Sequence, residues 1–254
     1  MLKPFLLFLS CAVFISIGII LIEPDLIISV EAQDSGENHF RHLREKMVKN
    51  QISHPPDYRQ PVRDERVLEA MRTVPRHCFV KQQDISRAYR DYPIPIGYGQ
   101  TISQPYIVAL MTEMLDVKPE HKVLEVGTGS GYQTAILSCI VKEVYSIEIV
   151  RPLGEQAALR FKRFQYRNVR TKVDDGYYGW KENAPFDRII VTCAATIVPP
   201  PLLKQLRPGG KMCVPVGGQY AVQFLTMINK SMTGTISMQK MLPVRFVPLT
   251  RTVQ

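Results

Sequence analysis

Short apolar runs alternate with longer stretches of helical composition over the second half of the chain. The apolar runs predict buried strands, and the stretches between them predict helices at 134–141 and 152–164. The strands are expected at 123–126, 143–149, 169–173 and 186–192. Because strands that alternate with helices are typical of parallel βα units, the pattern predicts an α/β fold with a doubly wound, mostly parallel sheet.

The segments outside these units follow other patterns. Residues 38–53 place apolar side chains at helical spacing among basic ones, which predicts a peripheral amphipathic helix. Residues 64–73 predict a second helix that ends before Pro75. The prolines and glycines of 92–99 exclude a helix and indicate an extended loop. Late, partly antiparallel strands are expected at 209–216, 220–228 and 235–247.

The segment Val123–Gln133, which reads VLEVGTGSGYQ, joins the first strand to the first helix of these units. Three of its residues are glycines at alternate positions: Gly127, Gly129 and Gly131. Glycine allows a positive φ and lets backbone N–H groups approach a ligand with no Cβ in the way. The turn therefore predicts a binding site for a nucleotide-type ligand.

The spacing of the glycines and the nearby acids indicates which ligand this is. The dinucleotide fingerprint is G-x-G-x-x-G, whereas position 132 is tyrosine and the pattern here is G-x-G-x-G. Glu125 would repel a pyrophosphate but suits a ligand that carries an amino group and a sulfonium charge. Glu148 is placed to hold both ribose hydroxyls, and Asp175 to lie beside the adenine. The pattern favours S-adenosylmethionine over NAD, and a glycine turn without a cofactor is the alternative.

A second candidate site precedes the glycine turn. The string Gln100-Thr101-Ile102-Ser103-Gln104-Pro105 leads into a helix expected at 106–115. Ser103 is expected to be the N-cap, and Pro105 fits the first turn, where its missing N–H has no cost. A helix N-terminus beside a free hydroxyl can also bind a carboxylate. Ser103 is therefore interpreted as a cap, as a carboxylate-binding residue, or as both.

The length of the chain limits the number of domains, and its net charge limits the classes of partner. With 254 residues and 45% hydrophobic content, the chain can bury one full core. We expect a single domain over 38–254, with helices and loops in 38–105 and the cofactor-binding core and C-terminal strands in 106–254. The net charge of +9 is compatible with nucleic acid, an anionic membrane or acidic proteins. The basic residues are scattered singly and in pairs, which indicates a solvated basic surface.

The cysteines indicate no metal site. The chain has no C-x-x-C and no histidine spacing suited to zinc. Cys139, Cys193 and Cys213 lie in apolar runs and are expected to be small buried hydrophobic residues. If the chain is exported, a disulfide between two of these cysteines, or between one of them and Cys78, is an alternative.

Residues 1–32 are interpreted as a signal peptide or an uncleaved membrane anchor. Lys3 precedes the uncharged run 5–22, which is long enough to span a bilayer, and Val30-Glu31-Ala32 offers small residues for cleavage. The acidic flank after the run predicts that the rest of the chain is translocated. This predicts a periplasmic or membrane-anchored protein with membrane contact through 5–22. A cytoplasmic location is the alternative, because S-adenosylmethionine is made and kept in the cytosol.

Several strings together resemble the protein-L-isoaspartate (D-aspartate) O-methyltransferase family, over about residues 42 to 250. Its members methylate the abnormal α-carboxyl group of isoaspartyl residues in damaged proteins, which initiates repair. The string GQTISQP is specific to the family, whereas G-x-G-x-G identifies only the methyltransferase class. The matching stretches are Val74-Pro75-Arg76 with Phe79-Val80, Pro95-Ile96-Gly97 leading to Gly99–Pro105, the VLEVGTGSGYQTAIL turn, Asp175-Gly176 with Gly179-Trp180, the segment 184–192, and Arg245-Phe246-Val247-Pro248-Leu249.

The resemblance implies a sheet of the S-adenosylmethionine-dependent methyltransferase type with an N-terminal helical extension. It also implies that Ser103 is the active-site residue. Implied cofactor contacts are Gln100, Thr101, Ile102, Ser103, the glycine turn, Glu148, Asp175 and Gly176. Residues 1–40 depart from the family, whose members are generally cytoplasmic and begin near the amphipathic helix.

The sequence shows no evident general base, and the reaction that the family resemblance implies does not need one. That reaction is methyl transfer from a sulfonium to an ionised carboxylate. Our hypothesis is that Ser103 and neighbouring N–H groups orient the carboxylate, while Glu125 and Glu148 hold the cofactor. The expected partners are damaged proteins or peptides that contain isoaspartyl residues, without nucleic acid, and the chain is expected to be a monomer.

Two other functional classes compete with this hypothesis. A nucleic-acid methyltransferase would share the cofactor-binding half, but residues 192–195 read Thr-Cys-Ala-Ala where amino-directed enzymes of that class carry an N-P-P-Y-like turn. A non-catalytic S-adenosylmethionine-binding module would bind the cofactor without turnover.

Overall fold

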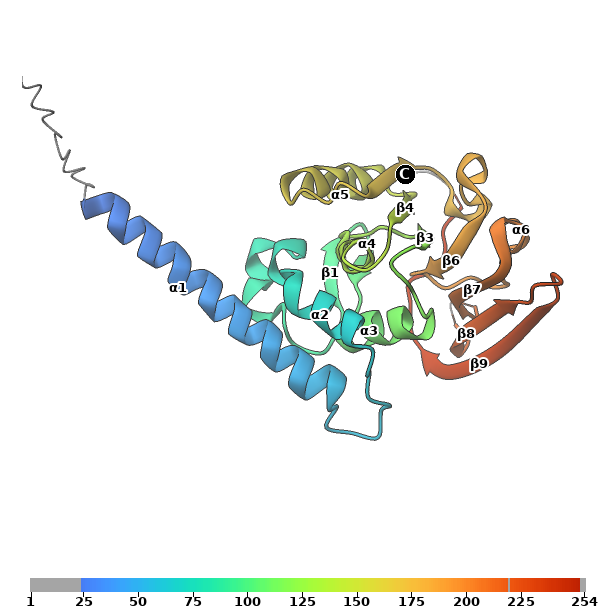
Figure 1. Ribbon diagram of the computed structural model, residues 1–254, viewed down its shortest axis with the longest axis horizontal. Helices are drawn as coiled ribbons and strands as arrows, with labels where there is room; N and C mark the ends of the chain where they lie inside the picture. Colours follow the sequence, from blue (N-terminus) through green and yellow to red (C-terminus); the bar gives the residue numbers. More distant parts are fainter. Residues whose placement is uncertain (1–23, 219, 252–254) are drawn as a thin grey trace, which may run out of the picture. The chain divides into compact units, whose positions relative to one another are not determined.

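One seven-stranded sheet organises the unit that begins at His39 (Figure 1). The computed structural model describes residues 24–218 and 220–251, and the chain divides into two compact units after Asn38. The strand order is β5-β4-β3-β6-β7-β8-β9. The bounds are β3 Lys122–Val126, β4 Glu143–Glu148, β5 Val169–Val173, β6 Phe186–Val191, β7 Leu206–Val216, β8 Gln223–Lys230 and β9 Ile236–Val244.

The pairing of these strands confirms the predicted topology. Neighbouring strands from β5 through β7 are parallel, whereas β8 is antiparallel to both β7 and β9. From β3 the chain moves outward through β4 to β5, and it then returns to β6 on the other side of β3. This reversal creates a switch point between β3 and β6, where open α/β sheets bind ligands at the carboxyl ends of their strands.

The helices differ from the predicted ranges mainly at their ends. The bounds are α1 Pro24–Met47, α2 Glu65–Thr73, α3 Pro105–Met114, α4 Tyr132–Ser138, α5 Arg151–Arg163 and α6 Pro200–Gln205. The helix expected over 38–53 begins earlier, and its last part, Val48–Ser53, is π-helical. Helix α4 starts directly after Gly131 and ends at Ser138. Because α4 ends there, Cys139 is exposed, and the prediction that it is buried was wrong.

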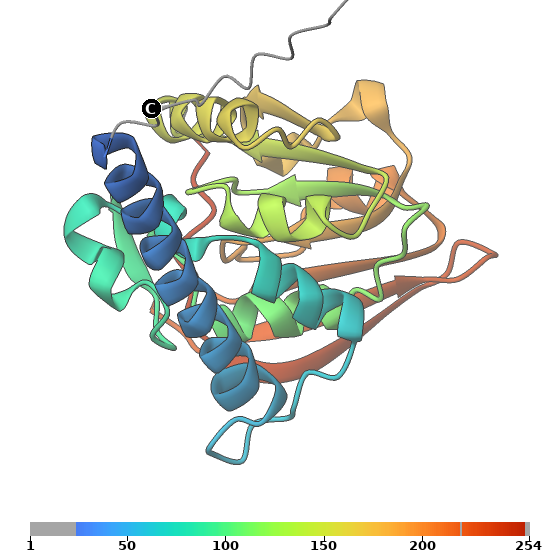
Figure 2. The same ribbon diagram turned by 60° about the vertical axis from the view of Figure 1, so that its left-hand side comes forward.

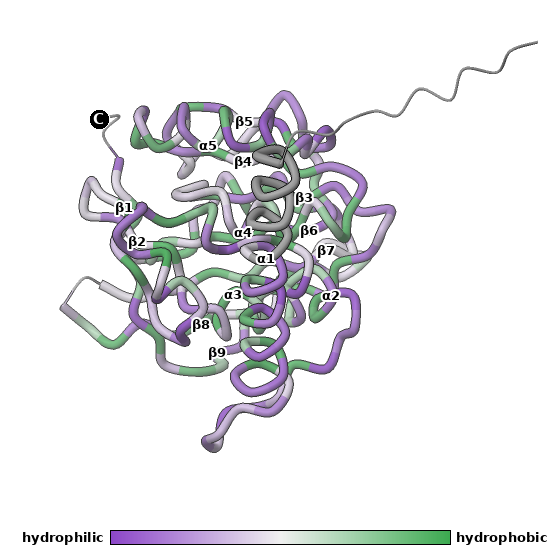
Figure 3. The backbone as a smooth tube through the Cα atoms, turned by 90° about the vertical axis from the view of Figure 1, so that its left-hand side faces the viewer, coloured by the Kyte–Doolittle hydropathy of each residue, from purple (hydrophilic) through white to green (hydrophobic). Residues whose placement is uncertain are grey.

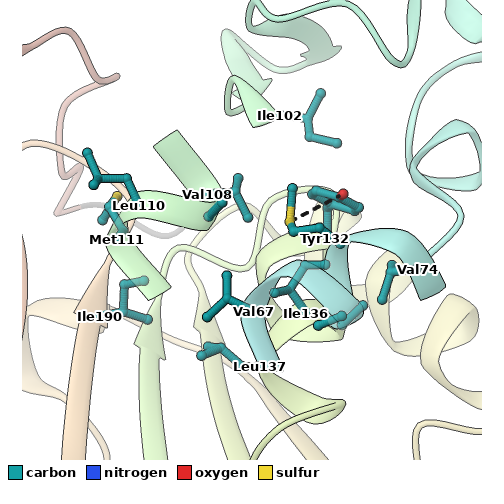
Figure 4. Close-up of a cluster of buried hydrophobic side chains, with 14 of the residues drawn as sticks. Val67, Val74, Ile102, Val108, Leu110, Met111, Tyr132, Ile136, Leu137 and Ile190 are labelled. Carbon is teal, nitrogen blue, oxygen red and sulfur yellow. Dashed lines mark hydrogen bonds between the residues drawn. The ribbon is translucent and has the colours of Figure 1, made fainter. Parts of the chain in front are cut away.

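Helices α2 to α5 cover one face of the sheet. Their apolar side chains form one buried cluster with alternate strand residues such as Val123, Val144 and Ile190. Figure 4 shows α2, α3 and α4 residues of this cluster converging, with the Tyr132 hydroxyl 3.8 Å from Met71 Sδ. In Figure 3 the described part of α1 is mostly hydrophilic. Its apolar Phe40 packs against the same cluster, as the amphipathic pattern predicts.

The opposite face carries a second, smaller cluster. The intervening strand residues Leu124, Tyr145 and Ile189 belong to it, together with Leu202 of α6 and half-buried Trp180. In Figure 2 the long antiparallel strands β8 and β9 lie side by side at one edge of the sheet. The central strands β3, β4 and β6 are buried on both faces, and a mostly apolar run is the pattern expected of such strands.

No helix within residues 24–218 and 220–251 is long and apolar enough to cross a membrane. The apolar run 5–22, on which the anchor prediction rests, lies outside the described residues. That prediction therefore stays untested.

Candidate active site

A cavity of about 720 Å³, open solvent at its mouth included, lies at the switch point of the sheet. Its floor is formed by the carboxyl ends of β3, β4 and β6, and one wall by strand β2 (Gln100–Ile102) of a short hairpin with β1 (Ile94–Gly97). The lining residues are Gln100–Ser103, Val108, Val126–Ser130, Tyr132, Gln133, Ile147–Ile149, Gly176, Thr192, Cys193 and Val247–Thr250. The sequence-predicted residues Gln100, Thr101, Ile102, Ser103, Glu148, Gly176 and the turn glycines Gly127 and Gly129 thus come together here.

The glycine turn requires glycine at two positions for steric reasons. Gly127 and Gly131 have φ values of 98° and 89°. A Cβ on Gly127 would lie 2.4 Å from Thr192 Oγ1, and one on Gly131 would lie 2.7 Å from the Phe161 ring. Gly131 does not line the cavity; it allows α5 to pack against the start of α4. The three glycines therefore serve two purposes, ligand approach and helix packing.

Glu148 is the one charged side chain among the described residues that line the cavity. It ends β4 and is almost fully buried. The Gly129 N–H donates to its Oε2 (2.6 Å), and the Val150 N–H donates to its Oε1 (2.9 Å). Burial raises the pKa of Glu148, and these backbone donors oppose that rise. Since an ionised carboxylate has about four acceptor sites, two remain for a ligand.

Glu125 does not line the cavity, in contrast to the expected contact with the cofactor. It is fully buried on the face of the sheet covered by α4, and its Oε2 accepts hydrogen bonds from the hydroxyls of Thr134 and Ser146. Burial, opposed by these hydroxyls, raises the pKa of Glu125 to about 8. Its Oε1 is buried without a hydrogen-bond partner in the described residues. Glu125 therefore supports the turn from beneath, because alternation along β3 directs its side chain toward α4.

The titration of Glu125 predicts a pH dependence of stability. Because the folded-state pKa is raised above the value of 4.5 for an unburied glutamate, the folded state holds this proton more tightly. The stabilisation is complete below about pH 4.5 and is lost as the pH rises toward 8, with a slope near 1.4 kcal/mol per pH unit for one proton. We expect Glu125→Gln to remove most of this slope. Urea unfolding of both proteins without cofactor from pH 5 to 8 measures it, and parallel pH profiles would contradict the assignment.

Ser103 is not the N-cap of α3, contrary to the prediction. The cap is Gln104, whose side chain makes no capping bond, and the Tyr106 N–H instead donates to Asp91 Oδ1 (3.1 Å). Asp91 also pairs with Arg59 (2.5 Å), so the start of α3 already holds a carboxylate. The expected carboxylate site at this helix N-terminus is therefore filled by the chain itself. No described residue makes a hydrogen bond to Ser103 Oγ, and this hydroxyl remains available to a ligand.

A buried arginine fixes the backbone at Ser103. Arg76 is fully buried, donates from Nη2 to the Ser103 carbonyl (2.7 Å) and from Nε to the Ala88 carbonyl (2.8 Å), and lies 4.8 Å from the Tyr132 ring centroid. Burial lowers the pKa of Arg76 to about 10, which leaves it charged at neutral pH. Arg76 thus links the segment that carries Ser103 to the helix that follows the glycine turn.

Asp175 lies next to the cavity but does not line it. Its Oδ1 accepts the Tyr177 N–H (3.0 Å), and its Oδ2 accepts Arg251 Nε (2.9 Å). The adjacent Gly176 does line the cavity. Gly176 therefore faces the cavity in place of Asp175, and the expected contact of Asp175 with the adenine stays a prediction.

Sequence analysis missed several lining residues. Thr128 and Ser130 lie between the glycines, so attention to the turn alone could have found them. Thr192 lines the cavity and donates to the Gly127 carbonyl (2.5 Å), and its place at the end of a predicted strand was a usable signal. Val247–Leu249 belong to a string that carries the family resemblance, but nothing in that string indicated a place in the cavity wall, because this place depends on the return of the chain after β9.

A second cavity adjoins the first. It is lined by Pro93, Thr101, Ser103, Gln104, Ile107, Thr192 and Pro243–Val247. Four residues are common to both cavities: Thr101, Ser103, Thr192 and Val247. The Ser103 side chain thus stands at the boundary between two spaces that could each hold one reactant.

Comparisons with known proteins agree with this geometry. Residues 45–254 match the protein family described as protein-L-isoaspartate(D-aspartate) O-methyltransferase. Relatives named protein-L-isoaspartate O-methyltransferase include one from Cupriavidus necator, 58% identical over 73% of this chain and 72% of its own length. One from Polaromonas is 54% identical over 75% of this chain and 90% of its own length.

Solved structures extend the similarity to three dimensions. A structure named protein-L-isoaspartate O-methyltransferase aligns with a TM-score of 0.74 and 28% identity, over 84% of this chain and 67% of its own. A beta-aspartate methyltransferase from Plasmodium falciparum aligns with a TM-score of 0.68 and 26% identity, over 83% of this chain and 98% of its own. That protein was crystallised in complex with S-adenosyl-L-homocysteine.

Proposed function

This chain belongs to the protein-L-isoaspartate(D-aspartate) O-methyltransferase family, and we propose on that basis how its residues carry out the family's reaction. The chain is an S-adenosylmethionine-dependent carboxyl O-methyltransferase. It transfers a methyl group to the free α-carboxyl of L-isoaspartyl and D-aspartyl residues in damaged proteins, which initiates their repair.

The first cavity fits S-adenosylmethionine better than a dinucleotide. No lysine or arginine is among the described residues that line it, so no basic side chain there would balance a pyrophosphate. Glu148 offers acceptor sites suited to a ribose diol, and it contributes negative charge that a sulfonium ligand would favour. Gly127 and Gly129 of the glycine turn line the cavity, and a Cβ on Gly127 would press on Thr192, which also lines it. We assign cofactor binding to Gln100–Ser103, Gly127, Gly129, Glu148 and Gly176.

The boundary position of Ser103 is the observation that carries the proposed mechanism. The methyl donor would lie in the cavity of the glycine turn, and the isoaspartyl carboxylate would enter from the adjoining cavity. Because Thr101, Ser103 and Thr192 line both spaces, the two reactants would meet beside these hydroxyls.

Ser103 orients the acceptor in this mechanism. When bound, S-adenosylmethionine supplies an electrophilic methyl group. The substrate carboxylate is already ionised at neutral pH, so the chain needs only to hold one oxygen toward that methyl and to exclude water. We assign the donor to Ser103 Oγ, which no described residue engages, with its backbone held by Arg76. Such orientation can contribute several kcal/mol to lowering the barrier.

Methyl incorporation tests the proposed function. The full-length protein would be given labelled S-adenosylmethionine and one peptide in its isoaspartyl and its aspartyl form. Base-labile label on the isoaspartyl peptide alone is expected, because only this form presents a free α-carboxyl at the linkage. Equal label on both peptides, or label on nucleic acid, would contradict it. Cofactor binding without turnover would identify a binding module instead.

We further propose that the chain is a monomer and that the run 5–22 directs it to a membrane or through one. Sedimentation of the purified protein would give a single species with the mass of one chain. Cell fractionation would place the full chain, but not a chain that begins at His39, with membranes or in the periplasm. Recovery of the full chain in the cytosol would favour the alternative location.

A further inference from the structure

The segment Val247–Arg251, here called the C-terminal strap, crosses one side of the cofactor cavity. Two backbone hydrogen bonds tie it to Ala194: the Ala194 N–H donates to the Val247 carbonyl (2.8 Å), and the Leu249 N–H donates to the Ala194 carbonyl (2.8 Å). Residues Val247–Thr250 line the cavity. The strap is therefore a wall of the cavity that belongs to neither the sheet nor the glycine turn.

Arg251 joins the end of the strap to the loop after β5. Its Nε donates to Asp175 Oδ2 (2.9 Å), and its guanidinium lies 3.7 Å from the Tyr177 ring centroid and 5.1 Å from that of Tyr178. The loop side is itself ordered, because the other oxygen of Asp175 accepts the Tyr177 N–H. Since Gly176 also lines the cavity, the Arg251 contacts connect two parts of its wall that are distant in sequence.

These contacts are weak enough to open. The Arg251 side chain is 45% exposed, so its ion pair contributes little after solvent screening. Stacking on Tyr177 adds a modest cation–π contribution. Beyond Leu249, no backbone hydrogen bond holds the described part of the strap. By contrast, β3, β4 and β6 are paired on both sides within the sheet, so the strap opens at a lower cost than these strands.

We propose that Arg251 is a positioning residue for cofactor retention. Through Asp175 and Tyr177 it holds the C-terminal strap closed over the cofactor cavity, and release of this contact lets the cofactor leave. The inference rests on the assignment of S-adenosylmethionine to the first cavity. It assigns Asp175 to closure of the cavity through Arg251 rather than to a contact made directly from the cavity wall.

Dissociation of S-adenosylhomocysteine from the full-length protein tests the proposal without methyl transfer. The single tryptophan, Trp180, follows Tyr178 closely in the same loop and serves as a fluorescence reporter for stopped-flow displacement. We expect Arg251→Ala to increase the dissociation rate about three- to tenfold, which corresponds to about 0.7–1.4 kcal/mol. Arg251→Lys keeps the charge but not the planar stacking group, so an intermediate rate is expected.

Arg66 provides the matched control. Its side chain is 41% exposed, close to the value for Arg251, and it pairs with Asp64 (2.5 Å) at the start of α2 without lining either cavity. Arg66→Ala should leave the dissociation rate unchanged. Raising the salt concentration should accelerate dissociation from the wild type more than from Arg251→Ala, because the ion pair is screened.

Two outcomes would overturn the proposal: an unchanged dissociation rate in Arg251→Ala, or an equal increase in Arg66→Ala. Failure of the wild type to bind S-adenosylhomocysteine would instead overturn the cofactor assignment. Thermal unfolding of each variant would identify a general loss of stability, and a faster dissociation that only accompanied unfolding would also count against a specific role of Arg251.

Discussion

Replacement of Glu148 by alanine is expected to weaken binding of S-adenosylhomocysteine by about 10²- to 10⁴-fold. Two hydrogen bonds from ribose hydroxyls to a charged, buried acceptor are each worth roughly 1.5–3 kcal/mol, and their joint loss corresponds to this range. The substitution also leaves the Gly129 N–H without its acceptor, which loosens the glycine turn. Glu148→Gln should be less severe, because the amide keeps one acceptor oxygen.

Calorimetric titration with S-adenosylhomocysteine measures this effect. The control is Glu143→Ala at the opposite end of the same strand, where the side chain faces Arg170 at 3.6 Å and does not line the cavity. It should bind with wild-type affinity. A dissociation constant for Glu148→Ala within twofold of the wild type would show that Glu148 only supports the turn.

Replacement of Ser103 by alanine is expected to lower kcat/KM for an isoaspartyl peptide by about 10²-fold. A hydroxyl donor that acts on a charged oxygen at the reacting centre is typically worth this much, because its strength increases in a water-poor site. Cofactor affinity should change by no more than a few fold, because the Ser103 backbone remains held by Arg76. The combination of impaired turnover and retained binding distinguishes a substrate-orienting hydroxyl from a structural one.

Steady-state methylation and calorimetry on the same preparation provide both quantities. Ser103→Thr keeps a hydroxyl and should recover part of the activity. Ser53→Ala serves as the control, since the Ser53 hydroxyl bonds only to backbone carbonyls and to His54 at the end of the π-helical turn. Full kcat/KM in Ser103→Ala would remove the serine from the mechanism. A parallel loss of cofactor binding would indicate a structural role.

Local patterns in the sequence were sufficient for the sheet and for the glycine turn. The central strands β3, β4 and β6 are buried on both faces, so their mostly apolar residues were visible as short runs. The turn glycines were visible from their alternate positions, and they adopt φ values that other residues rarely adopt. The tertiary structure corrected details that depend on packing. The Asp91 carboxylate, from a different segment, accepts the Tyr106 N–H at the start of α3, where Ser103 was expected to be the cap. Cys139 is exposed because α4 ends at Ser138, three residues before the predicted end at 141.

In the candidate site too, some residues could be predicted from local patterns and others depended on tertiary packing. Glu148 and the segment Gln100–Ser103 were found because they lie within recognisable strings. Glu125 was expected to contact the cofactor because it lies two residues before the first glycine of the turn. Strand alternation instead directs its side chain beneath the turn. Proximity in sequence could not reveal on which side of the sheet its carboxylate lies.

The sequence by itself determined the βα architecture, the glycine turn and the family, because periodicity, glycine spacing and short motifs are local properties. Only the tertiary structure decided which groups share the cavity wall. Arg251 of the C-terminal strap contacts Asp175, which lies 76 residues earlier in the sequence. Ser103 and Thr192, also distant in sequence, both line the boundary of the two cavities. Such contacts arise when separate elements pack on one sheet, and no local pattern encodes them.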